Sequence, residues 1–244
     1  MSTAIVVTSG KGGTGKTSVT AGVAVCLAQR GSRVLCVDMD IGLRNLDLAL
    51  GMSDRALMDF TDVIEGRCPL LRAAVSHPDI PNLSLLTAPL APPTVEEDAL
   101  RALVREAGEH FDFIFMDAPA GLGRGFRLAS CAAQRALVVS TSDPTALRDA
   151  QRTVLALLDR VPTIHLVMNR VQTKLLRKME TNIDDAMDTA GLPLLGVIPE
   201  DQIVPLLAAK GDPLLLRYSK KAAVAYENIA LRLCGTMVPI MRIR

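Results

Sequence analysis

The chain has 244 residues, of which 49% are hydrophobic and 22% charged. This balance excludes a disordered chain and fits one domain of the larger α/β kind. The formal net charge of +1 gives no global reason to expect strong binding to DNA.

Five scattered cysteines without a C-x-x-C pair favour a reducing, cytoplasmic compartment over a disulfide scaffold. Polar residues interrupt the first apolar run almost at once, and no apolar stretch approaches the length of a membrane span. We therefore expect a protein without a signal peptide or a transmembrane helix.

Short apolar runs rich in β-branched residues alternate with helical segments along the chain. The predicted strands are residues 3–9, 33–39, 83–88, 111–117, 136–141, 163–169 and 194–198. The predicted helices are residues 17–30, 95–109, 124–133, 146–159, 174–190 and 222–234. Most strands are almost continuously hydrophobic, which is typical of strands covered on both faces. The order predicts an α/β fold, with a doubly wound, mostly parallel sheet, helices on both faces and functional loops at the carboxyl ends of the strands. We expect a single domain over residues 1–235, followed by a short basic and apolar tail over residues 236–244.

The loop between the first strand and the first helix fits the phosphate-binding pattern G-x-x-x-x-G-K-[ST]. Its glycines permit positive φ and let backbone N–H groups surround phosphate oxygens, and the helix that follows presents its free N-terminal amides. Lys16 is expected to bind the outer phosphates and the Thr17 hydroxyl to ligate Mg²⁺. The predicted nucleotide-binding residues of the loop are Gly10, Lys11, Gly12, Gly13, Thr14, Gly15, Lys16, Thr17 and Ser18. The alternative is a glycine-rich turn that fits by chance, and Lys11 is a second lysine that an ordinary phosphate loop does not need.

Two predicted strands end in an aspartate, Asp38 and Asp117. Partial burial penalises a carboxylate, whereas a nearby Mg²⁺ favours it, so both residues are predicted to hold this ion together with Thr17. Asp40 follows on a loop, where it could orient an attacking water beside a γ-phosphate. The alternatives are a helix cap or turn former for the first two residues and a solvated acidic loop for Asp40.

Residues 11–17, Lys-Gly-Gly-Thr-Gly-Lys-Thr, resemble the deviant Walker A motif of the MinD/ParA family of P-loop ATPases. Residues 38–47, DMDIGLRNLD, are similar to the segment typical of the MinD branch, which selects the site of bacterial division. Residues 117–121, 147–150 and 196–201 match as well, and the resemblance extends to about Cys234.

The resemblance implies a Mg²⁺-dependent ATP hydrolase that is activated as an ATP-bound homodimer. By position, Lys11 matches the lysine that reaches the phosphates of the partner subunit, and Asp40 matches the water-activating aspartate. Lys11, Lys16 and Asp40 are therefore the expected catalytic residues. Five further residues are expected to bind the nucleotide: Asn45 in the first switch, the loop that also carries Asp40, and Asn169, Pro199, Glu200 and Asp201 near adenine. Without the resemblance, the last four would be read as ordinary turn residues.

The same resemblance implies a MinC-like division inhibitor and a MinE-like topology factor as partners. It also implies a cytoplasmic protein that can associate peripherally with the inner face of the cell membrane. The tail is basic and apolar, but Pro239 breaks a helix, so we expect weak or no autonomous membrane binding. A second departure is the loop at residues 142–147, which lacks a glutamate common in the MinD branch.

Three other functions remain open at this point. A ParA-like ATPase would bind DNA non-specifically and with steep salt dependence, which the net charge disfavours. A flagellar-placement ATPase of the same family would share the phosphate loop and the loops that follow Asp38 and Asp117. A metabolic reductase or amidoligase could also share the phosphate loop. An iron–sulfur reductase would place a cysteine at the subunit interface, close behind residues 117–121; Cys131 lies ten residues past Gly121, and no second cysteine accompanies it.

Overall fold

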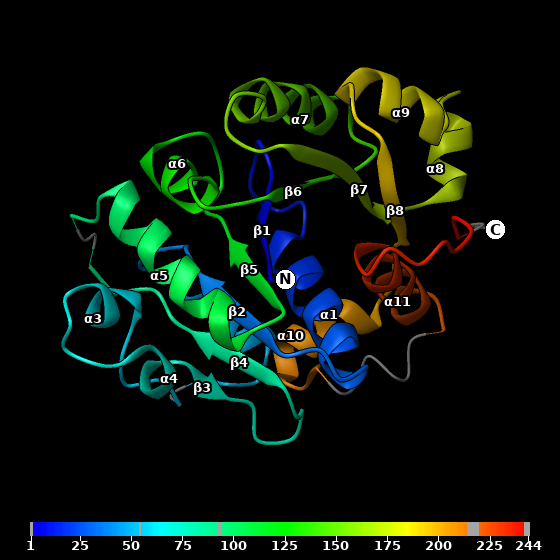
Figure 1. Cartoon of the computed structure of the whole chain (residues 1–244). Helices are drawn as coiled ribbons and strands as arrows, with labels where there is room; N and C mark the ends of the chain where they lie inside the picture. The colour runs from blue at the N-terminus through cyan, green and yellow to red at the C-terminus, as the bar shows by residue number, and fades with distance from the viewer. Residues whose placement is uncertain (1, 54, 92–93, 214–219, 242–244) are drawn as a thin grey trace.

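The computed structural model describes residues 2–53, 55–91, 94–213 and 220–241 (Figure 1). Within them the strands form one sheet in the order β3-β4-β2-β5-β1-β6-β7-β8. The strands are β1 Thr3–Thr8, β2 Val34–Asp38, β3 Val75–Ser76, β4 Leu83–Leu86, β5 Phe113–Asp117, β6 Arg135–Ser140, β7 Thr163–Val171 and β8 Leu194–Pro199. All neighbouring pairs are parallel except β3 with β4. The predicted doubly wound, mostly parallel sheet is therefore confirmed.

Helices cover both faces of the sheet, as Figure 1 shows. They are α1 Lys16–Gln29, α2 Asn45–Ala49, α3 Phe60–Ile64, α4 Leu70–Ala73, α5 Glu97–His110, α6 Arg124–Ser130, α7 Pro144–Leu157, α8 Thr173–Lys178, α9 Ile183–Ala190, α10 Ile203–Lys210 and α11 Ala222–Leu233. Successive side chains of a strand point to opposite faces. In β1, Ala4 and Val6 belong to the core under α5, α6 and α7, whereas Ile5 and Val7 belong to the core under α1 and α11. The continuous hydrophobic run thus supplies two cores at once.

The prediction of one helix over residues 174–190 is wrong. The structure divides this stretch into α8 and α9. Glu180 takes a left-handed φ of 52°, which interrupts the helix. Asn182 then starts α9 through a capping box with Asp185. Helices α2, α3, α4 and α10 and the short strand β3 were not predicted.

Helix α11 packs closely on α1 through a glycine and an aromatic ring. A Cβ added at Gly22 would lie 2.8 Å from the ring of Tyr226, so the contact requires glycine. The Tyr226 hydroxyl is buried there without a hydrogen-bond partner among the described residues. Burial also raises the pKa of this hydroxyl.

The strand β8 lies at one edge of the sheet. Helix α11 holds the residues that follow this helix against the same edge. The guanidinium of Arg232 donates to the carbonyl oxygen of Leu195 in β8 and, at 2.7 Å, to that of Val238. Met241 packs against the core below α1 and α11. Residues 236–241 therefore follow the free edge, and residues 242–244 of the predicted tail lie outside the described part of the chain.

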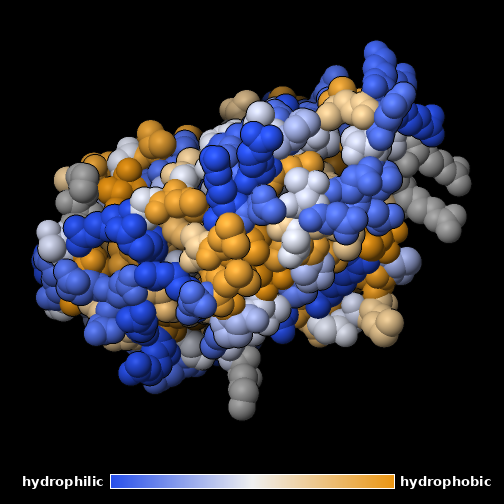
Figure 2. All heavy atoms as spheres, turned by 90° about the horizontal axis from the view of Figure 1, so that it is seen from above, coloured by the Kyte–Doolittle hydropathy of each residue, from blue (hydrophilic) through white to orange (hydrophobic). Residues whose placement is uncertain are grey.

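The loops that follow β2, β4 and β5 expose leucines at the carboxyl end of the sheet. Leu43 is 67% exposed, Leu90 71% and Leu122 37%. Figure 2, a view from above, shows another side of the molecule, where apolar side chains gather among hydrophilic ones near the middle. None of the helices in the described ranges is both long and apolar enough to cross a membrane.

Candidate functional site

The predicted phosphate loop joins β1 to α1 at the carboxyl end of the sheet. Gly13 and Gly15 have φ values of 80° and 90°, a conformation that glycine adopts without a steric penalty. Gly15 precedes the first turn of α1, and no side chain caps that helix end. The first amides of α1 can therefore bind an anion. Gly10 is required for another reason, because an added Cβ would overlap the backbone of Asp149 in α7.

Lys16 is buried at the start of α1, with 8% of its surface exposed. Burial lowers its pKa, while the nearby carboxylates of Asp117 and Asp40 act in the opposite direction. Thr17 Oγ1 donates to Asp117 Oδ2 at 2.6 Å, and Thr20 Oγ1 donates to Asp117 Oδ1 at 3.1 Å. Thr20 was not predicted, although its position three residues after Thr17 places both hydroxyls on one face of the helix.

The two strand-ending aspartates lie side by side. Asp38 is paired with Asp117 in the register of β2 and β5. Burial raises the pKa of Asp117 to about 7, with a further contribution from Asp38, and raises that of Asp38 to about 6. A cation bound nearby would favour the charged form of both buried carboxyls and would lower their raised pKa values.

The donor atoms of this cluster suit Mg²⁺ that is also held by a nucleotide. No group of three or more His, Cys, Asp or Glu side chains able to hold a metal ion occurs among the residues that the structure describes. Mg²⁺ in phosphate-transferring proteins commonly takes one or two carboxylates, with phosphate and water oxygens completing its octahedron. The Thr17 hydroxyl at 2.6 Å from Asp117 and the adjacent Asp38 fit this pattern.

Asp40 and Asn45 lie on the segment after β2. The Asp38 carboxylate accepts the backbone N–H groups of Asp40 at 2.8 Å and of Leu46 at 3.1 Å. The carboxylate thereby connects the loop that contains Asp40 with the start of α2. Burial raises the pKa of Asp40, and Lys16 opposes the shift. Asn45 is the first residue of α2 and is exposed.

The extra lysine of the loop binds the start of α7. Lys11 Nζ donates to Thr145 Oγ1 at 2.7 Å and to Asp143 Oδ2 at 3.2 Å. Asp143 is also the N-cap of α7, and its hydrogen bonds with Thr145, followed by that from Lys11, lower its pKa to about 2. Both partners belong to the loop at residues 142–147 that departs from the MinD pattern.

The residues predicted near adenine line one pocket beside the phosphate loop. Its volume is about 300 Å³, and Asn169, Pro199, Glu200 and Asp201 line it together with Gly13, Gly15, Ser18, Arg170, Ile198, Val204 and Pro205. Asn169 is buried and donates from Nδ2 to the carbonyl oxygen of Thr14 at 2.8 Å. Asn169 therefore also fixes the backbone of the phosphate loop at Thr14. The structure thus brings the predicted adenine residues and phosphate loop together, and the roles assigned to them stay predictions.

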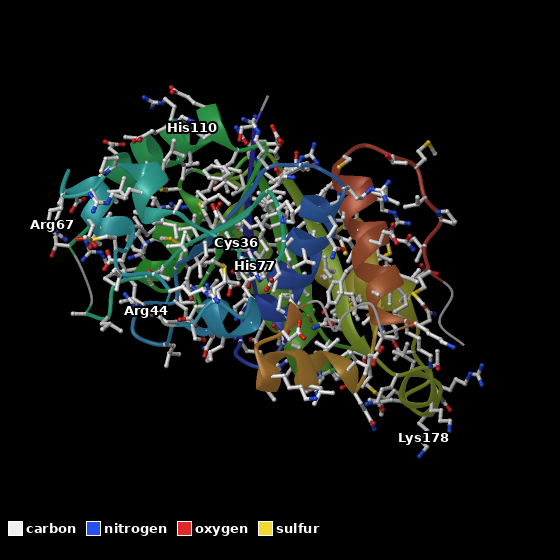
Figure 3. The ribbon with its side chains drawn as sticks, turned by 90° about the horizontal axis from the view of Figure 1, so that it is seen from below. Cys36, Arg44, Arg67, His77, His110 and Lys178 are labelled. Carbon is white, nitrogen blue, oxygen red and sulfur yellow. The ribbon has the colours of Figure 1, made fainter. Side chains whose placement is uncertain are left out.

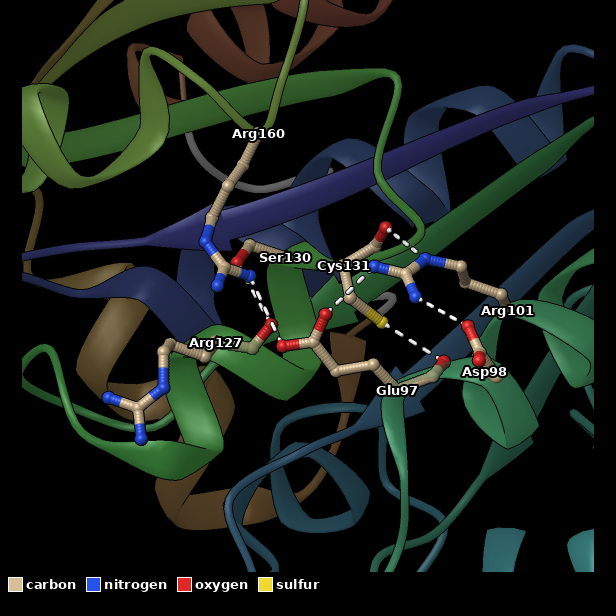
Figure 4. Close-up of polar contacts among 7 residues, drawn as sticks. All are labelled: Glu97, Asp98, Arg101, Arg127, Ser130, Cys131 and Arg160. Carbon is tan, nitrogen blue, oxygen red and sulfur yellow. Dashed lines mark hydrogen bonds and ion pairs between the residues drawn. The ribbon is translucent and has the colours of Figure 1, made fainter.

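Cys131 lies at the amino end of the sheet, near the starts of the central strands β1 and β6. Its thiol donates to the carbonyl oxygen of Glu97 at 3.5 Å, and its own carbonyl accepts from Arg101 at 3.2 Å (Figure 4). Burial raises the pKa of this thiol to about 11. Glu97 also forms ion pairs with Arg101 and Arg160. The cysteine thus belongs to packing between α5 and α6, away from the phosphate loop.

Comparison with known proteins agrees with this geometry. Residues 5–214 match the family model described as the CobQ/CobB/MinD/ParA nucleotide binding domain. The septum site-determining protein MinD of Synechocystis is 37% identical over 247 residues, which cover 99% of this chain and 92% of that protein.

Two solved structures are similar as well. The MinC:MinD cell division complex of Aquifex aeolicus contains a chain with a TM-score of 0.91 and 33% identity, with 99% of both chains covered. The septum site-determining protein MinD of Pyrococcus horikoshii, complexed with Mg-ADP, has a TM-score of 0.83 and 29% identity, with 96% of both chains covered.

Proposed function

The chain belongs to the CobQ/CobB/MinD/ParA family of nucleotide-binding proteins, and we propose that it is an ATP-hydrolysing switch. This switch helps to place the division septum. Its relatives over nearly full length carry the name septum site-determining protein. The observation that carries the proposal is that Asp117 accepts a hydrogen bond from Thr17 in the first turn of α1, where Asp117 and Asp40 both lie near Lys16. This arrangement suits binding and cleavage of a nucleoside triphosphate.

The nucleotide is expected to lie along the start of α1. The amides of the loop and Lys16 would bind its phosphates, and the pocket at Asn169 and Pro199–Asp201 would take its base. Thr17, Asp38 and Asp117 would hold Mg²⁺, which supplies neutralisation of phosphate charge.

Asp40 is the residue that we assign to the attacking water. Its carboxylate lies near Lys16, and the bond from its backbone to Asp38 orients the loop. Water adds to the γ-phosphorus, the bond to the bridging oxygen breaks, and ADP, phosphate and a proton are released. Positioning of this kind, together with electrostatic stabilisation of the phosphoryl group, accounts for almost all of the catalysis of phosphoryl transfer by a protein.

Steady-state ATP turnover tests this assignment. Asp40→Ala and Lys16→Ala are each expected to lower kcat at least about a hundredfold. Lys16→Ala should also weaken nucleotide binding, whereas Asp40→Ala should leave it intact. Normal turnover by Asp40→Ala would refute the mechanism.

Lys11 is proposed to act on the nucleotide of a second copy. In the isolated chain its ammonium is held by Asp143 and Thr145 through bonds exposed to solvent, which are weak. Exchange of these partners for a triphosphate in a facing subunit would therefore cost little. Sedimentation with Mg²⁺ and ATP should give a dimer of the wild type, formed with the Asp40→Ala variant as well, and a monomer of Lys11→Ala. A dimer that forms equally well without Lys11 would overturn this role.

Family membership also suggests partner proteins and an association with the membrane. One similar structure is a MinC:MinD complex, so we propose a MinC-like inhibitor as a partner here, together with a MinE-like factor that stimulates hydrolysis. The protein is proposed to act in the cytoplasm and at the inner face of the membrane, with weak or no membrane binding by the tail alone. The test is co-sedimentation with anionic liposomes, compared between samples with ATP and samples with ADP. Salt-sensitive binding to DNA without liposome binding would instead favour a ParA-like role.

A further inference from the structure

Helix α2 links the catalytic centre to a second region of the molecule. Its amino end is tied to Asp38, whose carboxylate accepts the backbone N–H groups of Leu46 and Asp40. These two bonds make the start of α2 and the Asp40 loop one unit. A displacement of the start of α2 would therefore act on the loop that carries Asp40.

The carboxyl end of α2 is tied down as well. The Leu50 carbonyl oxygen lies 2.9 Å from His77 Nε2, and His77 Nδ1 accepts the backbone N–H groups of Asp79 and Ile80, each at 3.0 Å. Because Nδ1 is an acceptor twice, the proton of the neutral ring is assigned to Nε2, which donates to Leu50. His77 is buried, and Figure 3 shows it in the interior, while Arg67 and Lys178 lie at the periphery.

The residue after this tie contacts a segment far away in the sequence. Gly51 has a φ of 66°, and a Cβ added to it would overlap the carbonyl oxygen of Gly211. Gly211 has a φ of 57° and lies near the carbonyl oxygen of Leu48. The close approach of the two backbones therefore depends on the absence of a side chain at Gly51.

Helix α10 leads from that contact to the pocket at Asn169 and Pro199–Asp201, referred to below as the base pocket. It ends at Lys210, directly before Gly211, and it packs against α2. Asp201 holds its start, since Asp201 Oδ1 accepts the backbone N–H of Ile203 at 2.9 Å. Val204 and Pro205, in its first turn, line the pocket. One short helix therefore extends from the base pocket to Gly51.

We propose that α10 couples the base pocket to the first switch, and that the Gly51–Gly211 contact is the positioning element of this coupling. A base in the pocket packs against Val204 and Pro205 and restrains the first turn of α10. The restraint passes through Gly211 and Gly51 to α2, and through Asp38 to Asp40. The inference rests on the proposed function and adds that the base, besides the phosphates, helps to assemble the hydrolytic site.

Hydrogen exchange of the full chain tests the coupling without requiring hydrolysis. The probes are saturating Mg·ADP, which fills both parts of the site, and saturating Mg·pyrophosphate, which has no base. Exchange of the α2 amides should be roughly fivefold or more slower with ADP than with pyrophosphate, in the range of typical coupling between sites. Equal protection by the two probes in the wild type would overturn the proposal without any variant.

Two glycine substitutions identify the contact responsible. Gly51→Ala separates α2 from α10 and should abolish the difference between the probes. Gly66→Ala is the matched control, because Gly66 has a similar φ of 71° but nothing within 4 Å of an added Cβ. The difference should persist in this control. Its survival in Gly51→Ala, or its loss in both variants, would refute the coupling.

Turnover separates this inference from the proposed function. Gly51→Ala should lower kcat for ATP roughly fivefold or more, while KM changes less than about twofold, because the phosphate loop is intact. A wild type without any ATPase activity would refute the proposed function, while the exchange comparison would still decide the coupling. An unchanged kcat in Gly51→Ala would count against the coupling alone.

Discussion

Asp117 ends β5 as a buried carboxyl between two threonine hydroxyls and the second aspartate. Its pKa of about 7 in the folded protein is far above the usual value, mainly because of burial. The folded state therefore binds a proton that the unfolded state has lost, between the two pKa values. The resulting stabilisation is complete below the unfolded pKa and is lost as the pH rises through about 7.

Asp117→Asn should accordingly separate stability from activity. The amide removes the buried charge, so the melting temperature of the nucleotide-free variant should equal or exceed that of the wild type. This advantage should grow by about 2–4 °C or more between about pH 5.5 and about pH 8, while kcat for ATP falls at least about a hundredfold. Calorimetry at the two pH values and ATP turnover are the measurements.

Asp112 provides the control for that titration. Its ion pair with Arg33 lowers its pKa, so the charged form is the stable one throughout that pH range. The effect of Asp112→Asn on the melting temperature should therefore be independent of pH there. A difference for Asp117→Asn that is equally flat would contradict the assignment of its burial cost.

Tyr226 shows the reverse situation, a buried polar atom with no charge and no described partner. Because its ring fills the contact at Gly22, the hydroxyl can be removed without creating a large cavity. Tyr226→Phe should leave the free energy of unfolding unchanged or raise it by about 1 kcal/mol, since an unsatisfied buried donor is removed. Urea denaturation measures this, and Tyr226→Ala should lose about 3–5 kcal/mol as a cavity control. A clear loss in Tyr226→Phe would mean that the hydroxyl is hydrogen-bonded.

Among the elements, α9 depends on Asn182, the N-cap residue directly before it. Asn182 Oδ1 accepts the N–H groups of Asp184 at 2.7 Å and Asp185 at 3.0 Å, and Asp185 Oδ2 accepts the N–H of Asn182 at 2.8 Å. Asn182→Ala should cost about 1 kcal/mol, which corresponds to a decrease of about 2–4 °C in the melting temperature. Asp188→Asn, at an exposed position of the same helix, should change it little. Equal effects of both variants would show that the cap contributes nothing.

The elements also show how far the sequence alone predicts this fold. The phosphate loop, α1 and the ends of β2 and β5 could be predicted, because their chemistry is local and each pattern is contiguous. The break at Glu180 was missed, although Asn182 and Asp185 have the spacing of a capping box. The bond from Lys11 to Asp143 and the contact between Gly51 and Gly211 could not be predicted, because they join segments far apart in the chain.

At the scale of the whole molecule, the site draws on five strand ends. The loop after β1, Asn169 in β7 and the segment after β8 line one pocket. Asp117 at the end of β5 accepts a hydrogen bond from Thr17 beside that loop and is paired with Asp38 at the end of β2. A nucleotide bound there contacts both halves of the chain and should stabilise the fold as a whole.

Mg·ADP should therefore raise the stability of the entire protein. At a ligand concentration of about 100 times Kd the gain is about 2.7 kcal/mol, or roughly 5–10 °C in melting temperature. Lys16→Ala should lose most of this shift, and Lys11→Ala should keep it, since Lys11 is assigned to the other subunit. Loss of the shift in Lys11→Ala would show that this lysine serves its own nucleotide.

Arg232 should affect how readily the protein self-associates in solution. An open strand edge is a template for pairing with another chain, and such pairing leads to aggregates. By holding Leu195 and Val238 together, Arg232 keeps residues 236–241 along the free edge of β8. When the protein is concentrated, loss of this guanidinium should appear first as light scattering from self-association rather than as a change in turnover.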